Sequence, residues 1–131
     1  KEYGISVKKR YSRNIPYVMM DHDKVEQAII NILLNSVEAL KNGGQIEIIT
    51  RRDMKNGGLV KVEINDNGVG IAAEDLAYVF DPFFSKKKKG TGLGLSNVKK
   101  IIETHGGTVT IAPGKKQGTH FCLSIPIRET L

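Results

Sequence analysis

Three polar side chains at helical spacing are the first candidates for chemistry in this sequence. Asn31, Asn35 and Glu38 are four and three residues apart, so on a helix they share an arc of roughly 60°. Apolar residues surround this stripe on nearly every side, which predicts a buried helix: Ala28, Ile29, Ile30, Ile32, Leu33, Leu34, Val37, Ala39 and Leu40. A buried amide or carboxylate without a partner costs about 1–3 kcal/mol or more. The stripe therefore faces either a ligand or solvent that enters through a gap between elements.

A carboxylate followed by two glycines is the second candidate. Asp66 precedes Gly68 and Gly70 in the letters NDNGVG, and it shares strand parity with the apolar residues at 60, 62 and 64. This parity predicts that Asp66 lies on the core face, where a carboxylate needs hydrogen-bond donors. The amino group of adenine is one such donor, and the glycines would let the backbone pass close to a flat ring. The competing interpretation is an ordinary turn, because glycines often follow Asp in turns.

A glycine-rich loop, Gly90–Leu95 (GTGLGL), is the third candidate because it runs directly into a predicted helix. Glycine N–H groups can approach phosphate oxygens, and a helix N-terminus adds partial positive charge. The loop is not of the Walker type, since no Gly-Lys-Ser/Thr ends it. It is not of the dinucleotide type either, since a loop rather than a strand precedes it. The run Lys86–Lys89 just before it is either a solvated loop or a mobile clamp of charges on a triphosphate.

Hydrophobic periodicity and turn residues predict the elements that position these candidates. Alternation predicts strands at 5–11, 46–50, 60–64, 108–112 and 119–127, with a further extended piece at 17–20. Helical spacing predicts a long helix from Asp21 or Asp23 to about Lys41, a short helix at 72–79, and a third from 92–95 to a stop at 106–107. The grouping of strands and helices predicts an α/β sandwich in a single domain, residues 1–131. Its sheet is expected to be mixed, mostly antiparallel, and covered on one face by helices.

The overall composition and charge limit the classes of partner that this chain is expected to bind. The 131 residues carry a net charge of +6, which raises the possibility of nucleic acid. However, aromatic residues are not interleaved with the basic ones, so no nucleic-acid partner is expected. No stretch approaches the ~20 apolar residues of a membrane span, and no membrane contact by this domain is expected. The single cysteine, Cys122, favours a reducing, cytoplasmic setting, and the first residue, Lys1, indicates a fragment of a longer protein.

Four segments taken in chain order resemble the N, G1, F and G2 boxes of sensor histidine kinases. They are the asparagine stripe, the Asp-x-Gly-x-Gly segment, Phe80–Phe84 (FDPFF), and the GTGLGL loop. The resemblance covers essentially the whole chain and extends to the superfamily of gyrase, Hsp90, MutL and histidine kinases. It implies the same α/β sandwich, with ATP and Mg²⁺ as cofactors.

The resemblance also implies individual roles. Asp66 would bind the adenine amino group, Asn35 would supply an oxygen to Mg²⁺, and Asn31 would steady the phosphates or the water shell of the metal. Asn31 and Asn35 are thus the catalytic candidates, and no general base is identified. A lid over roughly 81–91 would close over ATP. The implied ATP-binding residues are Asn31, Asn35, Glu38, Asp66, Gly68, Gly70, Ile71, Phe80, Lys87, Gly90, Thr91, Gly92, Leu93, Gly94, Leu95 and Thr119.

Two positions depart from the family pattern. Glu38 stands where many of these kinases have Lys or Arg, and it cannot neutralise phosphate. Asn31 stands where the ATP-hydrolysing and serine-phosphorylating relatives have a Glu, and an amide cannot act as a base. The second departure favours transfer to a nucleophile that needs little activation, such as a neutral imidazole.

The expected function is therefore transfer of the γ-phosphoryl group of Mg·ATP to a histidine on a separate, upstream dimerisation domain, with a response regulator as indirect partner. The full-length protein could be anchored in a membrane. None of His22, His105 and His120 fits the acceptor motif His-Glu/Asp-x-x-x-Pro; we interpret them as helix-start, helix-end and exposed strand residues. The alternatives are an ATPase or serine kinase of the same superfamily, or a non-catalytic nucleotide sensor.

Overall fold

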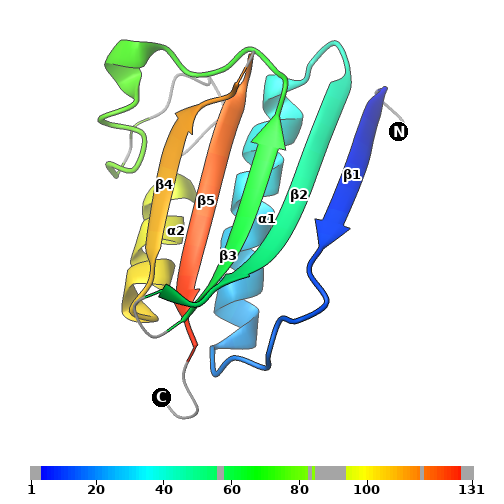
Figure 1. The fold of residues 1–131 in the computed structure, drawn as a ribbon. Coiled ribbons are helices and arrows are strands. Elements are labelled where there is room, and N and C mark those ends of the chain that lie inside the picture. Colours follow the sequence, from blue (N-terminus) through cyan, green and yellow to red (C-terminus); the bar gives the residue numbers. More distant parts are fainter. Residues whose placement is uncertain (1–3, 56–57, 83, 85–93, 116, 128–131) are drawn as a thin grey trace.

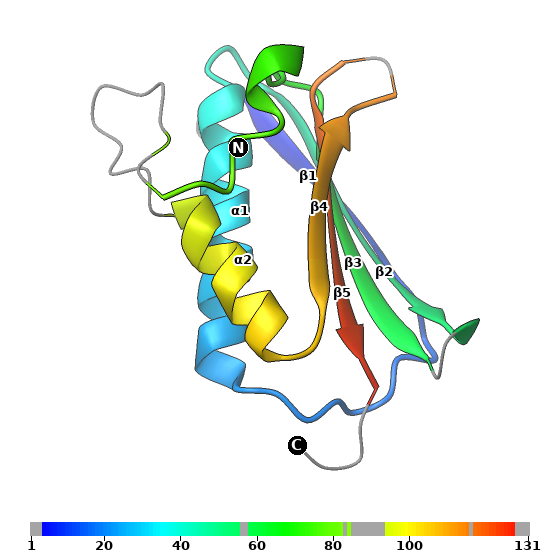
Figure 2. The ribbon, with the colours of Figure 1, turned by 90° about the vertical axis from the view of Figure 1, so that its left-hand side faces the viewer.

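Two helices pack on one face of a five-stranded sheet (Figure 1, Figure 2). The computed structural model describes residues 4–55, 58–82, 84, 94–115 and 117–127. The strands are β1 (Ile5–Tyr11), β2 (Gly44–Asp53), β3 (Leu59–Asp66), β4 (Thr108–Pro113) and β5 (Thr119–Pro126). The helices are α1 (His22–Ala39) and α2 (Gly94–Thr104), and a 3-10 turn, η2, spans Ala73–Asp75.

The sheet is mixed, with strand order β1-β2-β3-β5-β4. Within the described part of the chain, only β1 and β2 pair in parallel, and the other three strand pairs are antiparallel. A parallel pair needs a crossover connection, which α1 supplies between β1 and β2. This topology confirms the predicted mixed, mostly antiparallel sheet covered on one face. In the register of β3, Asp66 pairs with Ile46 on one side and with Thr119 on the other.

The core lies between the sheet and the helices because apolar residues alternate along the strands. Ile64 of β3 and Ile32 of α1 are fully buried, and Phe121 of β5 is 2% exposed. Burial of a side chain of this size contributes about 1.5–3 kcal/mol. Asp66 follows Ile64 by two residues and is itself buried, so the predicted core-face position of this carboxylate is confirmed.

Helix α1 is not buried on all sides, contrary to the prediction. Its exposed side carries Ile30, Leu34 and Val37, whose exposed fractions are 40%, 54% and 39%. The reason is that, among the described residues, the sheet and α2 cover only part of the helix (Figure 2). The helix begins after Asp21, whose side chain accepts from the backbone N–H of Lys24 at 3.2 Å. No helix in the described residues is long and apolar enough to cross a membrane.

Two shorter predicted elements differ from the structure. The predicted helix at 72–79 is a 3-10 turn at Ala73–Asp75 followed by further turns, in which Tyr78 donates to Asp75 over 2.9 Å. Such i to i+3 bonds are typical of short helical pieces that cannot bury a continuous apolar stripe. The segment 17–20 forms no strand. Its residues Val18 and Met20 instead pack against the core from an irregular backbone.

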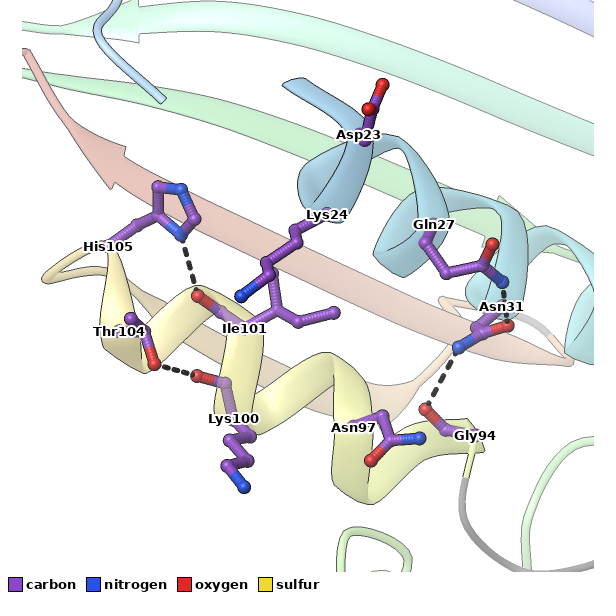
Figure 3. Close-up of a pocket in the computed structure, with 10 residues that line it drawn as sticks. All are labelled: Asp23, Lys24, Gln27, Asn31, Gly94, Asn97, Lys100, Ile101, Thr104 and His105. Atoms are coloured by element: carbon purple, nitrogen blue, oxygen red, sulfur yellow. Dashed lines mark hydrogen bonds between the residues drawn. The ribbon is translucent and has the colours of Figure 1, made fainter. Parts of the chain in front are cut away.

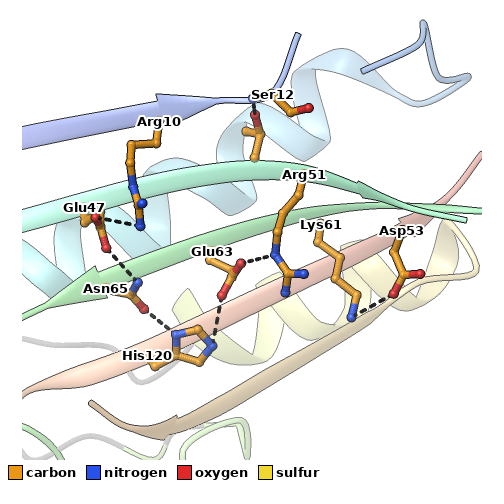
Figure 4. A network of polar contacts seen from close by, with 10 residues as sticks. Arg10, Ser12, Glu47, Arg51, Asp53, Lys61, Glu63, Asn65 and His120 are labelled. Carbon is orange, nitrogen blue, oxygen red and sulfur yellow. Dashed lines mark hydrogen bonds and ion pairs between the residues drawn. The ribbon is translucent and has the colours of Figure 1, made fainter. Parts of the chain in front are cut away.

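The face of the sheet opposite the helices carries a polar network (Figure 4). Glu47 accepts from Arg10 at 3.2 Å and from Asn65 at 3.4 Å, and Asn65 contacts His120. His120 is therefore half-buried and bonded, rather than exposed as predicted. Exposed ion pairs of this kind contribute at most about 1 kcal/mol each. A polar face is typical of an antiparallel sheet that packs on the core with one face and is exposed to solvent on the other.

Candidate nucleotide-binding site

Asp66 is a buried carboxylate at the end of β3, 6% exposed. Its Oδ1 accepts a hydrogen bond of 2.9 Å from the backbone N–H of Gly68. Burial raises the pKa of Asp66. Hydrogen bonds from the Gly68 N–H, the Ser36 hydroxyl and the Thr119 backbone N–H act in the opposite direction, because they favour the carboxylate. The effect of burial is larger, so the pKa of Asp66 is raised overall. A carboxylate has about four acceptor sites, so Asp66 retains capacity for a further donor from a ligand.

Ser36 is a residue of this site that our sequence-based interpretation missed. It is 1% exposed on α1, and its hydroxyl lies near enough to Asp66 to lower the pKa of that carboxyl. Even so, its Oγ makes no hydrogen bond of ordinary geometry within the described residues. The available signal was a serine within the apolar run of α1, immediately after Asn35. Buried polar atoms are normally paired, so Ser36 and Asp66 together form a buried polar cluster where α1 packs on β3.

The glycines after Asp66 are required by close backbone contacts. A Cβ on Gly68 would lie 2.4 Å from the carbonyl oxygen of Ala39, at the end of α1. The backbone N–H of Val69 donates to that same oxygen at 3.2 Å. Gly70 has a φ of 77°, a conformation that favours glycine. Gly68 is therefore explained by packing against α1, which differs from the sequence-based argument that it leaves room for a flat ring.

The turn between β4 and β5 also reaches this site. Gln117 donates through Nε2 to the carbonyl oxygens of Asn67 and Gly68, at 3.1 and 3.2 Å. Nothing in the sequence spacing indicated Gln117, because the contact joins segments about fifty residues apart. Thr119, predicted to line the adenine pocket, is buried and directly opposite Asp66. Ile71 is half-buried just beyond Gly70.

The asparagine stripe of α1 faces the beginning of α2. Asn31 donates through Nδ2 to the carbonyl oxygen of Gly94 at 3.4 Å, and its Oδ1 accepts from Gln27 at 3.0 Å. Asn35 is half-buried, whereas Glu38 is exposed. The stripe thus runs from a partnered amide at the helix interface to an exposed carboxylate. Of the two predicted surroundings, solvent is found at Glu38, and a ligand at the two asparagines stays a prediction.

A groove of about 670 Å³ continues from this point between the two helices (Figure 3). Its walls include Lys24, Gln27 and Asn31 from α1 and Gly94, Asn97 and Lys100 from α2. A Cβ on Gly94 would meet no atom within 4 Å, so the space beside the first residue of α2 is open. Asp66 does not line this groove. The carboxylate and the groove are therefore separate features, and of the stripe only Asn31 lines the groove.

The remaining predicted residues divide into two groups. Phe80 is half-buried under the ammonium of Lys99, which lies 6.0 Å from its ring centroid, and Leu95 packs against the core from α2. The predicted contacts of the glycine-rich loop and the lysine run lie outside the described residues, apart from Gly94 and Leu95. The positions concerned are Lys87, Gly90, Thr91, Gly92 and Leu93.

His105 directly follows the last residue of α2, Thr104, as predicted for a helix-end residue. It is buried, its Nε2 accepts from the backbone N–H of Asp21 at 2.9 Å, and its Nδ1 contacts the carbonyl oxygen of Ile101 at 2.8 Å. With Nδ1 as donor, one neutral tautomer satisfies both bonds. The ring therefore ties the end of α2 to the start of α1, while His22 is exposed at the first position of α1 as predicted.

We compared the chain with known protein families and structures. Residues 20–129 match the family described as histidine kinase-, DNA gyrase B-, and HSP90-like ATPase. The chain therefore belongs to this ATPase family, and within it to the catalytic domains of the histidine kinase type.

Among curated relatives, the chain is similar to sensor histidine kinase ZraS of Escherichia coli K12, with 37% identity over 123 residues. The match covers 92% of this chain and 26% of ZraS, so the chain spans about a quarter of that relative. Among solved structures, the catalytic domain of histidine kinase ThkA superposes with a TM-score of 0.84 at 32% identity, covering 99% of this chain and 84% of that one. Full-length ShkA in complex with AMPPNP superposes with a TM-score of 0.81 at 27% identity, covering 96% of this chain and 26% of ShkA.

Proposed function

We propose that this domain binds Mg·ATP and transfers its γ-phosphoryl group to a histidine on another domain of the same kinase. The observation that carries the proposal is the buried Asp66 carboxylate, which lies on the same side of the sheet as the asparagine stripe of α1. In this proposal Asp66 accepts from the base, and the polar side chains of the stripe serve the phosphates. The structure of ShkA with AMPPNP, an ATP analogue, supports the choice of ligand.

At the adenine end, the Asp66 carboxylate accepts from the exocyclic amino group of adenine. The Gly68 N–H and the Thr119 backbone hold this carboxylate in place, so it needs no rearrangement to receive the base. Guanine presents a carbonyl oxygen where adenine presents its amino group. Two facing acceptors would leave a buried polar group unpaired, so Asp66 selects adenine over guanine.

At the phosphate end, the first turn of α2 and the asparagine stripe provide the polar groups. The N–H groups of a first helical turn have no intrahelical partner and attract phosphate oxygens. Asn31 is adjacent to Gly94, the first residue of α2, and is placed to orient the phosphates. This proposed role of Asn31 agrees with the one implied by the resemblance to sensor histidine kinases, in which Asn31 steadies the phosphates or the water shell of the metal.

The described residues could bind Mg²⁺ only together with the phosphates of ATP. They contain no cluster of three or more His, Cys, Asp or Glu side chains that could hold a metal ion. The amide oxygen of Asn35 is a hard oxygen ligand, and Mg²⁺ accepts one or two protein ligands when phosphates and waters complete its shell. When bound, the ion neutralises charge on the phosphates during transfer. Asn35 is thus the residue of this chain that would hold it.

The transfer step requires positioning rather than a base. The imidazole nitrogen of the acceptor forms a bond to the γ-phosphorus, the bond to the bridging oxygen breaks, and ADP leaves with that electron pair. The phosphorylated ring then releases the proton of its other nitrogen to water. A neutral imidazole carries a free electron pair on the attacking nitrogen, so the amide of Asn31 suffices where a hydrolase would need a carboxylate. The proposal includes an acceptor domain elsewhere in the longer protein and a cytoplasmic setting. It also includes a response regulator as an indirect partner.

The test uses the full-length kinase and ATP labelled on the γ-phosphate. A phosphohistidine loses its label in acid and keeps it in base, so we expect incorporated label with that stability. The Asp66→Asn variant should incorporate far less label at limiting ATP. A label that survives acid and is lost in base would contradict the histidine assignment. Release of inorganic phosphate without labelled protein would favour the hydrolase alternative.

A further inference from the structure

The hydroxyl of Ser36 is a buried polar group that has no role in the proposed transfer. Ser36 is 1% exposed in α1, and its Oγ makes no hydrogen bond of ordinary geometry in the part of the chain that the structure describes. A serine inside a helix often donates to the carbonyl oxygen four residues earlier, here that of Ile32, but Ser36 makes no such bond. Because an unpaired buried hydroxyl is costly, this one requires a partner.

Helix α1 and strand β3 bring this hydroxyl to the carboxylate of Asp66. The two elements run toward the same end of the sheet (Figure 1). Ser36 lies one helical turn after Ile32, and Asp66 lies two strand residues after Ile64; both isoleucines are fully buried. The apolar stripe of α1 and the apolar face of β3 therefore each end in a buried polar side chain at the same end of the core.

The loop that follows β3 is attached to α1 one turn beyond Ser36. The carbonyl oxygen of Ala39 accepts from the N–H of Val69 at 3.2 Å, and a Cβ on Gly68 would lie 2.4 Å from that oxygen. Ser36 is three residues before Ala39, so the two are neighbours on the surface of the helix. Backbone packing therefore fixes the position of Ser36 relative to the start of this loop.

Ser36 is the side-chain member of a set of three donors around the Asp66 carboxylate. Burial raises the pKa of this carboxyl, and the Gly68 N–H, the Ser36 hydroxyl and the Thr119 N–H each act to lower it. Of the three, the Gly68 N–H donates to Oδ1 at 2.9 Å. Two of these donors belong to the backbone, so the hydroxyl is the one that a substitution can remove.

We propose that Ser36 is the positioning residue for Asp66, and that its hydroxyl donates to the carboxylate and holds it toward the amino group of adenine. The inference rests on the proposed function, because it assumes that Asp66 accepts from the base. Rotation about the last side-chain bond of an Asp is only weakly restricted, so a further donor narrows the orientations of the carboxylate. A carboxylate that is already oriented loses less freedom when adenine binds. Ser36 thus strengthens the selection of adenine through Asp66.

Two nucleosides that differ by one amino group test this role in the full-length kinase. Adenosine carries the exocyclic amino group and purine riboside lacks it, so the carboxylate can accept only from adenosine. Ser36→Ala should raise the Kd for adenosine about tenfold, a loss of roughly 1.4 kcal/mol, and change the Kd for purine riboside by less than about twofold. Equal weakening of both nucleosides would indicate a merely structural role and would overturn the proposal. An unchanged Kd for adenosine would overturn it as well.

Two further variants complete the experiment. Ser124→Ala is the matched control, because Ser124 is also a buried serine, 9% exposed, but it lies on the β5 face that carries His120, away from the helices. It should leave both Kd values unchanged. Asp66→Asn should itself reduce the preference for adenosine over purine riboside. A reduced preference in Asp66→Asn but not in Ser36→Ala would overturn the positioning role alone. An unchanged preference in Asp66→Asn would instead contradict the adenine assignment of the proposed function.

Discussion

The Oδ1 atom of Asp66 accepts a 2.9 Å hydrogen bond from the N–H of Gly68, two residues farther along the chain. The loop that leaves β3 therefore turns back onto the carboxylate to which we assign adenine binding. Because Gly68 also packs against the end of α1, this single contact links the base site to the helix that carries the asparagine stripe. Contacts within the protein thus fix the position of the carboxylate to which we assign adenine binding.

Replacing the carboxylate should weaken nucleotide binding without unfolding the protein. In Asp66→Asn one acceptor oxygen becomes an NH2 donor, which faces the adenine amino group. The loss of a hydrogen bond to a charged group, about 1.5–3 kcal/mol, predicts an ATP Kd raised roughly tenfold to more than a hundredfold, measured by calorimetry. Asp53→Asn, which alters a half-buried carboxylate that is paired with Lys61 and lies outside the site, is the control. An unchanged Kd in Asp66→Asn would contradict the adenine assignment.

The raised pKa of Asp66 predicts opposite pH effects on stability and on binding. Burial makes the folded-state pKa higher than the ordinary value of 3.8, so the folded chain holds this proton to higher pH than the unfolded chain does. As pH rises from the ordinary value through the folded pKa, the free energy of unfolding contributed by Asp66 falls. Adenosine affinity should rise over the same window, because the carboxylate is the stronger acceptor.

Adenosine is the suitable ligand for this measurement, since it has no titrating phosphates. The affinity profile of the unaltered domain should rise with pH, and that of Asp66→Asn should be flat across the same window. Parallel profiles for the two proteins would show that another group controls the pH dependence.

A methyl group at Gly68 should destabilise the fold. The Cβ of Gly68→Ala would lie 2.4 Å from the backbone oxygen of Ala39, so α1 and the loop must move apart. Overpacking of this kind costs about 1–3 kcal/mol, which a urea titration can measure. The matched control is Gly94→Ala, whose Cβ would meet nothing within 4 Å and whose helical position favours alanine. Equal stability of the two variants would contradict the close contact at Gly68.

Truncation of Asn31 should separate transfer from hydrolysis. Asn31→Ala removes an amide that contacts Gly94 at the phosphate end, so we expect slower phosphohistidine formation in the full-length kinase. Slow release of inorganic phosphate should be nearly unchanged, because an amide cannot serve as a general base. A phosphate assay and a labelling assay on the same preparation measure both rates. A loss of hydrolysis of several hundredfold would favour the ATPase alternative.

Much of the fold could be predicted from local patterns. The alternation in β2, β3 and β5 indicated which residues face the core, and the parity of Asp66 with Ile64 placed the carboxylate correctly. The turn at 42–44 ended α1 within two residues of the expected position, because glycines at positive φ follow the helix. Patterns of this kind succeed where a residue's environment depends on its near neighbours in the chain.

Other features depend on contacts between distant segments and could not be predicted. The apolar character of α1 was visible, but whether Ile30 and Leu34 are buried depends on how many layers the fold has. The contact of Gln117 with Gly68 depends on the alignment of the β4–β5 turn with the end of β3. By itself, the sequence determined the strands, the helix ends and the chemical types of the site residues, because these follow from periodicity and side-chain chemistry. Only the tertiary structure decided which faces are covered and which polar groups meet, because both depend on the packing of elements that are far apart in the chain.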